Sequence, residues 1–154
     1  MQTLAQATVP SRDSARTRID LKRVMRYENS AVVKKIEQTY GLSHADARIL
    51  FDDTKMFLYL CATNPSTKLG PTIPIDDGWH TFILFTEDYA AFCREQFGTF
   101  IHHQPHVEHG VADPSKLPPK VKVVVDLAHK VFGGQLSKNW DVQGLELADG
   151  NCTP

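Results

Sequence analysis

The sequence predicts a single compact all-α domain of about five to seven helices. Three observations support this fold class. Apolar residues recur at steps of three and four along most of the chain. Capping residues precede these segments, and glycine or proline follows them. The chain has 154 residues, of which 42% are hydrophobic, which is enough for one core. We expect a flexible tail over residues 1–14, a helical domain over 15–147 and a C-terminal tail over 148–154.

The sequence predicts three helices in the first half of the domain. A short one lies within residues 15–26, and a second is capped by Asn29 or Ser30 and terminated by Gly41. The third and clearest follows the capping residue Ser43 and ends before Pro65. Its broad apolar stripe consists of Ala47, Leu50, Phe51, Thr54, Phe57, Leu58 and Cys61. We expect this stripe to form the central layer of the core, with Cys61 as a core thiol.

The second half predicts three further helices. One opens at Asp76 and Asp77, whose carboxylates suit the positive end of the helix dipole. The next has Thr86 as its N-cap and stops at Gly98. The last begins at the double proline of residues 118–119. Its valine-rich start also alternates as a strand would, although the periodic continuation favours a helix.

Charge and cysteine content restrict the functional class. A net charge of -1 argues against a general phosphate-binding surface, so a nucleic-acid partner is not expected. Six cationic residues between positions 12 and 26 indicate a solvated helix face, with a local anionic partner as the alternative. Three widely spaced cysteines indicate no disulfide framework, and no segment resembles a signal peptide or a membrane span. We therefore expect a soluble, cytoplasmic protein.

A cluster of potential metal ligands follows the third helix. Five of the seven histidines and one of the three cysteines fall between residues 80 and 109. Imidazole and thiolate are ligands that zinc prefers. The prediction is a site with His80, Cys93 and one of His102 or His103. Zinc is the expected metal, with iron as the alternative if the thiolate is not a ligand. Asp76 lies one helical turn before His80 and can bind the same metal or orient the ring.

Structural alternatives exist for each of these residues. His80 can be a buried histidine bonded to a carboxylate, and Cys93 lies on the apolar side of its helix, where core cysteines are found. His106 and His109 follow a proline in an expected loop, as surface residues or as optional fourth ligands.

The motif Asp76-x-x-Trp79-His80, followed by Leu84, Tyr89 and Cys93, resembles the core of a known family. This is the glycine-rich-domain-containing protein family of plants, together with its uncharacterised bacterial relatives. The runs Phe-Leu-Tyr-Leu-Cys at residues 57–61 and Phe-Gly-x-Phe-Ile-His-His-x-Pro at 97–105 are similar to those relatives, so the resemblance covers about residues 43–105. The resemblance implies no biochemical activity. Some members have a second histidine two places after the first, where this chain has Phe82, and the plant glycine-rich segment is absent.

Two classes of function follow from the cluster. The preferred one is a small metal-stabilised binding or regulatory module, of a size that suits bacterial or phage biology, with a protein partner bound at the loops 66–74 or 104–119. The alternative is a metal-dependent enzyme of hydrolase type, in which metal-bound water attacks and Asp76 or Asp77 is the base. A cysteine–histidine nucleophile pair involving Cys93 is a third possibility.

Overall fold

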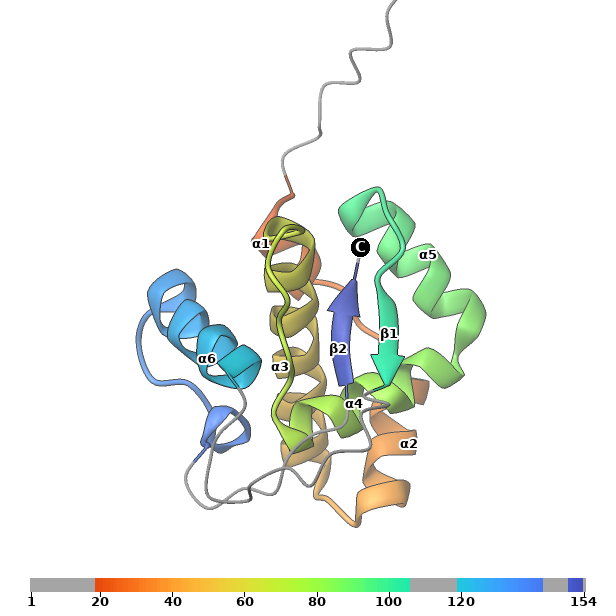
Figure 1. Ribbon diagram of the computed structural model, residues 1–154. Helices are drawn as coiled ribbons and strands as arrows, with labels where there is room; N and C mark the ends of the chain where they lie inside the picture. The colour runs from red at the N-terminus through yellow and green to blue at the C-terminus, as the bar shows by residue number, and fades with distance from the viewer. Residues whose placement is uncertain (1–18, 106–118, 143–149, 154) are drawn as a thin grey trace, which may run out of the picture.

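A computed structural model describes residues 19–105, 119–142 and 150–153 (Figure 1). Within these ranges the chain forms six α-helices, one 3-10 helix and a two-stranded antiparallel ribbon. The elements are α1 (Leu21–Met25), α2 (Ser30–Tyr40), α3 (His44–Thr63), α4 (Ile73–Leu84), α5 (Thr86–Phe97), β1 (His102–Pro105), α6 (Pro119–Phe132), η1 (Lys138–Trp140) and β2 (Gly150–Thr153). The all-α fold class is confirmed, and the ribbon is a small addition to it.

The long helix α3 is the centre of the molecule. It contacts α1, α2, α4 and α6, and in Figure 1 α4 crosses its lower end while α5 and α6 lie on opposite sides of it. The predicted apolar stripe faces inward, and Leu58 has no exposed surface. Phe82 of α4 connects the layers, with its ring centroid 5.1 Å from that of Phe51 on α3 and 5.2 Å from that of Phe92 on α5. The predicted central layer is therefore confirmed.

Local capping chemistry sets the ends of α2 and α3, as predicted. The Asn29 side chain accepts hydrogen bonds from the backbone N–H groups of Ala31 and Val32. Gly41 ends α2 with a φ of +64°, a left-handed conformation that glycine adopts without a Cβ clash. The Ser43 hydroxyl accepts a hydrogen bond from the N–H of Asp46 at the start of α3.

Two predicted helix starts differ from the structure. Helix α4 begins at Ile73 rather than at Asp76, because Pro74 lies in the first turn, where its missing N–H removes no helical hydrogen bond. Helix α5 has Phe85 as its N-cap with no side-chain hydrogen bond, and Thr86 is its first residue rather than its cap.

The strand β1 pairs with β2 from the far end of the chain. His103 is opposite Cys152 and Pro105 is opposite Gly150. Residues 150–153 were expected to belong to a tail. A four-residue strand has too little alternation to be recognised in the sequence without its partner. The valine-rich segment forms the helix α6, so the strand alternative for it is wrong.

Cysteine chemistry departs from the prediction. Cys61 is buried as expected, with 1% of its surface exposed, but it is disulfide-bonded rather than a thiol. The wide spacing of the cysteines along the chain gave no sign of this bond, because a disulfide depends on how the two cysteines lie in the folded structure. The disulfide removes the argument from cysteine chemistry for a reducing compartment, so a cytoplasmic location stays a prediction.

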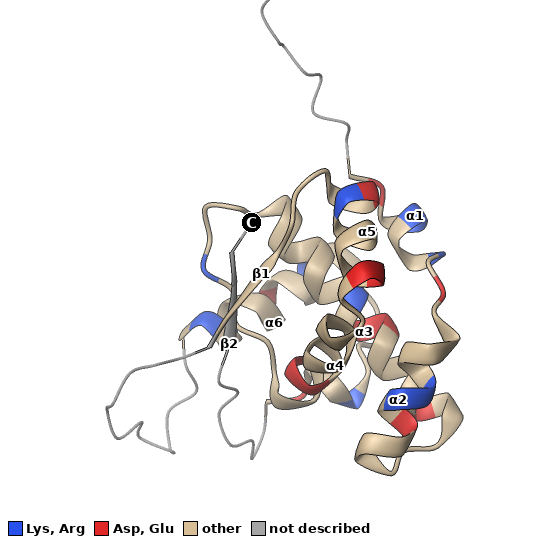
Figure 2. Cartoon of the chain, turned by 90° about the vertical axis from the view of Figure 1, so that its right-hand side faces the viewer, with Lys and Arg blue, Asp and Glu red and all other residues tan. Residues whose placement is uncertain are grey.

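The charges are spread over the described helices. Figure 2 shows acidic and basic residues interspersed along the face toward the viewer. No helix in the described ranges is long and apolar enough to cross a lipid bilayer.

Candidate metal centre

Three side chains from two elements converge at the junction of α4 and β1. Asp76 and His80 lie one turn apart on α4, and His103 comes from β1. One potential ligand atom from each lies within 4.8 Å of the others. A carboxylate and two imidazoles at this separation are suited to hold one metal ion.

The carboxylate of Asp76 lies between the two imidazoles. Its Oδ1 is 2.9 Å from Nε2 of His103, and its Oδ2 is 3.5 Å from Nδ1 of His80. The centroids of the two imidazole rings are 4.3 Å apart. Each ring therefore has its own carboxylate oxygen, and the predicted shared face of Asp76 and His80 is confirmed.

The site has a buried floor and an open side. The side chains of Asp76 and His103 are 8% and 9% exposed, whereas that of His80 is 50% exposed. Burial, followed by the charge of neighbouring Asp76, raises the pKa of Asp77. A bound cation would therefore contact solvent on the side of the half-exposed His80 ring.

Close packing of α4 on α3 fixes the helix that carries two of the three residues. Gly78 lies between Asp76 and His80 in sequence, and a Cβ atom there would collide with the Thr54 hydroxyl and lie 3.2 Å from Cγ of Leu50. Only glycine fits this approach without a shift in α3. This close approach at Gly78 therefore fixes the position of α4 relative to α3.

Cys93 and His102, both predicted as possible ligands, do not belong to this group. Alternation along β1 turns His103 inward and His102 to solvent, where its ring centroid lies 4.8 Å from that of Phe100. Cys93 is fully buried, and burial raises the pKa of its thiol, which disfavours the thiolate that metals bind. His106 and His109 lie outside the described residues.

Sequence reasoning missed two buried charges on α3. Asp53 is 4% exposed and Lys55 is 2% exposed. Lys55 lies four residues after Phe51 and three before Leu58, so helical periodicity placed it beside the apolar stripe. A charged residue at such a position is a recognisable signal for a buried polar contact.

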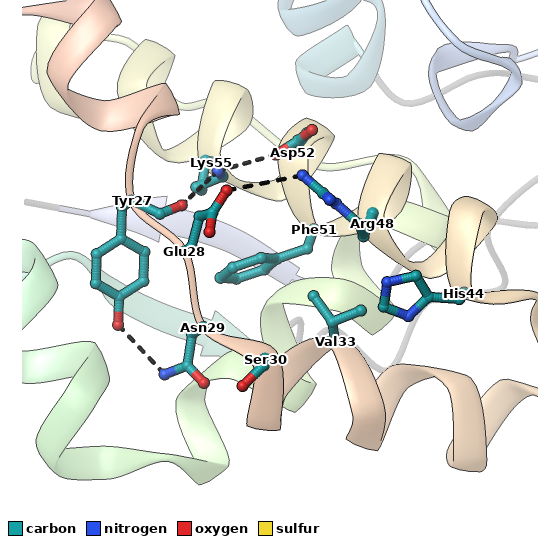
Figure 3. Close-up of a pocket in the computed structure, with 10 residues that line it drawn as sticks. All are labelled: Tyr27, Glu28, Asn29, Ser30, Val33, His44, Arg48, Phe51, Asp52 and Lys55. Carbon is teal, nitrogen blue, oxygen red and sulfur yellow. Dashed lines mark hydrogen bonds and ion pairs between the residues drawn. The ribbon is translucent and has the colours of Figure 1, made fainter.

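Lys55 lines a hollow of about 110 Å³ between the α1–α2 connection and α3 (Figure 3). Its Nζ donates to the backbone oxygens of Met25 at 3.1 Å and Tyr27 at 2.8 Å, and it lies 2.9 Å from Oδ1 of Asp52. All three ammonium protons are thereby used inside the protein. The three residues of the metal group lie elsewhere, so the hollow and the candidate metal centre are separate.

The fold and the site define a class: an all-α protein with a candidate centre of two histidines and one aspartate. The chain belongs to the UCP032817-like family, whose model matches residues 17–115. The match includes both α4 and β1, and with them all three residues of the site. No curated protein and no solved structure matches the chain. The narrower relation to the plant glycine-rich-domain family stays a prediction.

Proposed function

We propose that this protein binds a divalent transition metal through Asp76, His80 and His103 and acts as a metal-stabilised binding module. The observation that carries the proposal is the convergence of the three ligand atoms within 4.8 Å. Two imidazole nitrogens and one carboxylate oxygen form a common ligand set for zinc and for non-haem iron.

The arrangement of the rings supports a metal over a simple buried ion pair. Asp76 and His103 alone would complete such a pair, at 2.9 Å. His80 adds a second imidazole, whose ring centroid is 4.3 Å from that of His103 and which such a pair does not need. A bound cation would use every member of the group, with a nitrogen of each neutral ring and a carboxylate oxygen as ligands.

Zinc is the proposed metal and iron(II) the alternative. Because Cys93 lies outside the group, the argument from a thiolate ligand no longer favours zinc. Zinc remains the first choice because three-residue sites of histidine and carboxylate bind it without any redox requirement. Iron(II) becomes the closest competitor, because two histidines and a carboxylate also form its facial ligand set.

The metal would join α4 to β1, and the working surface would lie elsewhere. We place a protein partner, in the cytoplasm, at the exposed residues 65–68 between α3 and α4. Residues 69–72 of that predicted loop are buried, and Ile73 and Pro74 belong to α4. Most of the second predicted loop, 104–119, lies outside the described residues. Proteins retained by wild-type and Lys68→Ala baits should differ, and identical sets would count against this surface.

The decisive experiment is a metal titration of metal-free protein by calorimetry, with zinc and, under anaerobic conditions, iron(II). His103→Ala should weaken binding by more than about tenfold, because loss of an outer-shell partner of a ligand already costs about that much. His102→Ala is the matched control, since the neighbouring ring is exposed and outside the group, and it should bind as wild type. Equal affinities for wild type and His103→Ala would refute the proposed site.

A metal-dependent hydrolase is the second candidate, and the half-exposed His80 favours it. Three protein ligands leave one position of tetrahedral zinc for water, on the side where solvent reaches the site. Asp77 is then the candidate base. Relaxation measurements on a manganese(II)-loaded sample would count metal-bound waters, and a metal without exchangeable water would exclude this function.

A further inference from the structure

We infer that Tyr89 is a positioning residue for the metal ligand His103. Its hydroxyl joins the helix that carries Asp76 and His80 to the segment that leads into β1. The inference rests on the proposed metal site and adds to it a residue that touches none of the three candidate ligands directly.

The hydroxyl of Tyr89 makes two buried hydrogen bonds. It accepts from Nε1 of Trp79 at 2.9 Å and donates to the backbone oxygen of Ile101 at 2.7 Å. Trp79 and Ile101 have no exposed surface, and Tyr89 is 1% exposed. Both bonds have the usual length for their type and are shielded from water, so they hold α4, α5 and the start of the β1 segment in one arrangement.

Both hydrogen-bond partners of Tyr89 are near the candidate metal ligands in the chain. Trp79 is the residue before His80 on α4, and its ring centroid lies 4.4 Å from that of His103. Ile101 lies two residues before His103. The distance between the Trp79 indole and the Ile101 carbonyl therefore limits where His103 can place its nitrogen relative to Asp76.

Cys93 contributes at the same junction. Cys93 is a buried residue of α5, and its thiol is hydrogen-bonded with the backbone of Ile101 and with the Tyr89 side chain. The tyrosine and cysteine of the sequence motif thus meet at the backbone of Ile101, and the tryptophan is joined to them through the Tyr89 hydroxyl. In this arrangement they orient the ligands, and Asp76, His80 and His103 bind.

The test is Tyr89→Phe, which removes one oxygen atom and keeps the ring. We expect zinc affinity to fall about tenfold, the lower end of the effect of outer-shell partners. The visible absorption bands of the cobalt(II)-loaded protein should also shift, because they report ligand geometry. The matched control is Tyr27→Phe, which removes a hydroxyl that accepts from Asn29 on another face of the aromatic cluster, and it should leave both readouts unchanged.

Loss of stability alone must be separated from loss of positioning. Asp53→Asn serves this purpose, because the hydrogen-bond partners of Asp53 lie at η1 and Ser137 and not among the metal ligands. It should lower stability, because an asparagine side chain offers one acceptor oxygen to the three donors that the carboxylate binds, while the cobalt spectrum stays that of wild type. Wild-type zinc affinity with an unshifted spectrum in Tyr89→Phe would overturn this inference alone. Absence of metal binding by the wild-type protein would overturn the proposed function, and this inference with it.

Discussion

At the scale of single residues, Asp53 shows how burial competes with hydrogen bonding. Three donors converge on its carboxylate: the hydroxyl of Ser137 at 2.5 Å, the amide of Asn139 at 2.8 Å and the indole N–H of Trp140 at 2.8 Å. These bonds lower the pKa of Asp53, but its burial raises it by more. The carboxylate therefore connects α3 to η1, although burial of its negative charge costs free energy.

The raised pKa predicts the sign of a pH effect on stability. The folded protein holds the Asp53 proton more tightly than the unfolded chain does, whose aspartate pKa is about 3.9. The stabilisation is complete below that pH and is lost as pH rises through the folded pKa. Asp53→Asn lacks this titration, so the stability of wild type relative to the variant should decline as pH rises.

Urea unfolding of both proteins between about pH 3 and pH 6, the range that brackets the aspartate pKa, measures this difference. A difference that grows with pH would show instead that the three donors dominate and that the pKa of Asp53 is lowered on folding.

At the scale of elements, the contact of α4 with α3 decides where two metal ligands lie. Gly78→Ala would improve helix propensity by up to about 1 kcal/mol. The added methyl group would meet the Thr54 hydroxyl and Leu50, however, and overpacking a core typically costs about 1–3 kcal/mol. We expect a net loss of stability together with weaker zinc binding, measured by thermal unfolding and by titration.

A second substitution tests the cause. Thr54→Ala removes the nearest obstacle to the new methyl group, so the double variant should be more stable than the sum of the two single effects predicts. Additive effects would show that the contact between Gly78 and Thr54 does not control the position of α4.

At the scale of the whole molecule, metal binding should stabilise the fold. The proposed ligands come from α4 and from β1, which the unfolded chain does not hold together. Zinc at about 100 times its dissociation constant should raise the free energy of unfolding by about 2.7 kcal/mol. Thermal unfolding with and without zinc measures this. His102→Ala should keep the gain and His103→Ala should lose it, and an equal gain in both variants would contradict a specific site.

Much of the fold was predictable because helices are governed by local rules. Asn29, Gly41 and Ser43 act as caps and terminators through atoms only a few residues away. The stripe on α3 follows from the 3.6-residue period alone. The pairing of Asp76 with His80 needed only the one-turn spacing, and the opposite orientations of His102 and His103 needed only the order of neighbours in the chain.

The sequence by itself thus determined the helical class, the central helix and a histidine-rich region with an aspartate one turn away. Only the tertiary structure decided which residues meet. His103 reaches Asp76 across 27 positions, Cys93 turns into the core toward Ile101, and Cys61 forms a disulfide. The physical reason is that helix periodicity states which face is buried but not which buried faces touch. That choice depends on the packing of whole elements, such as the close approach that Gly78 permits.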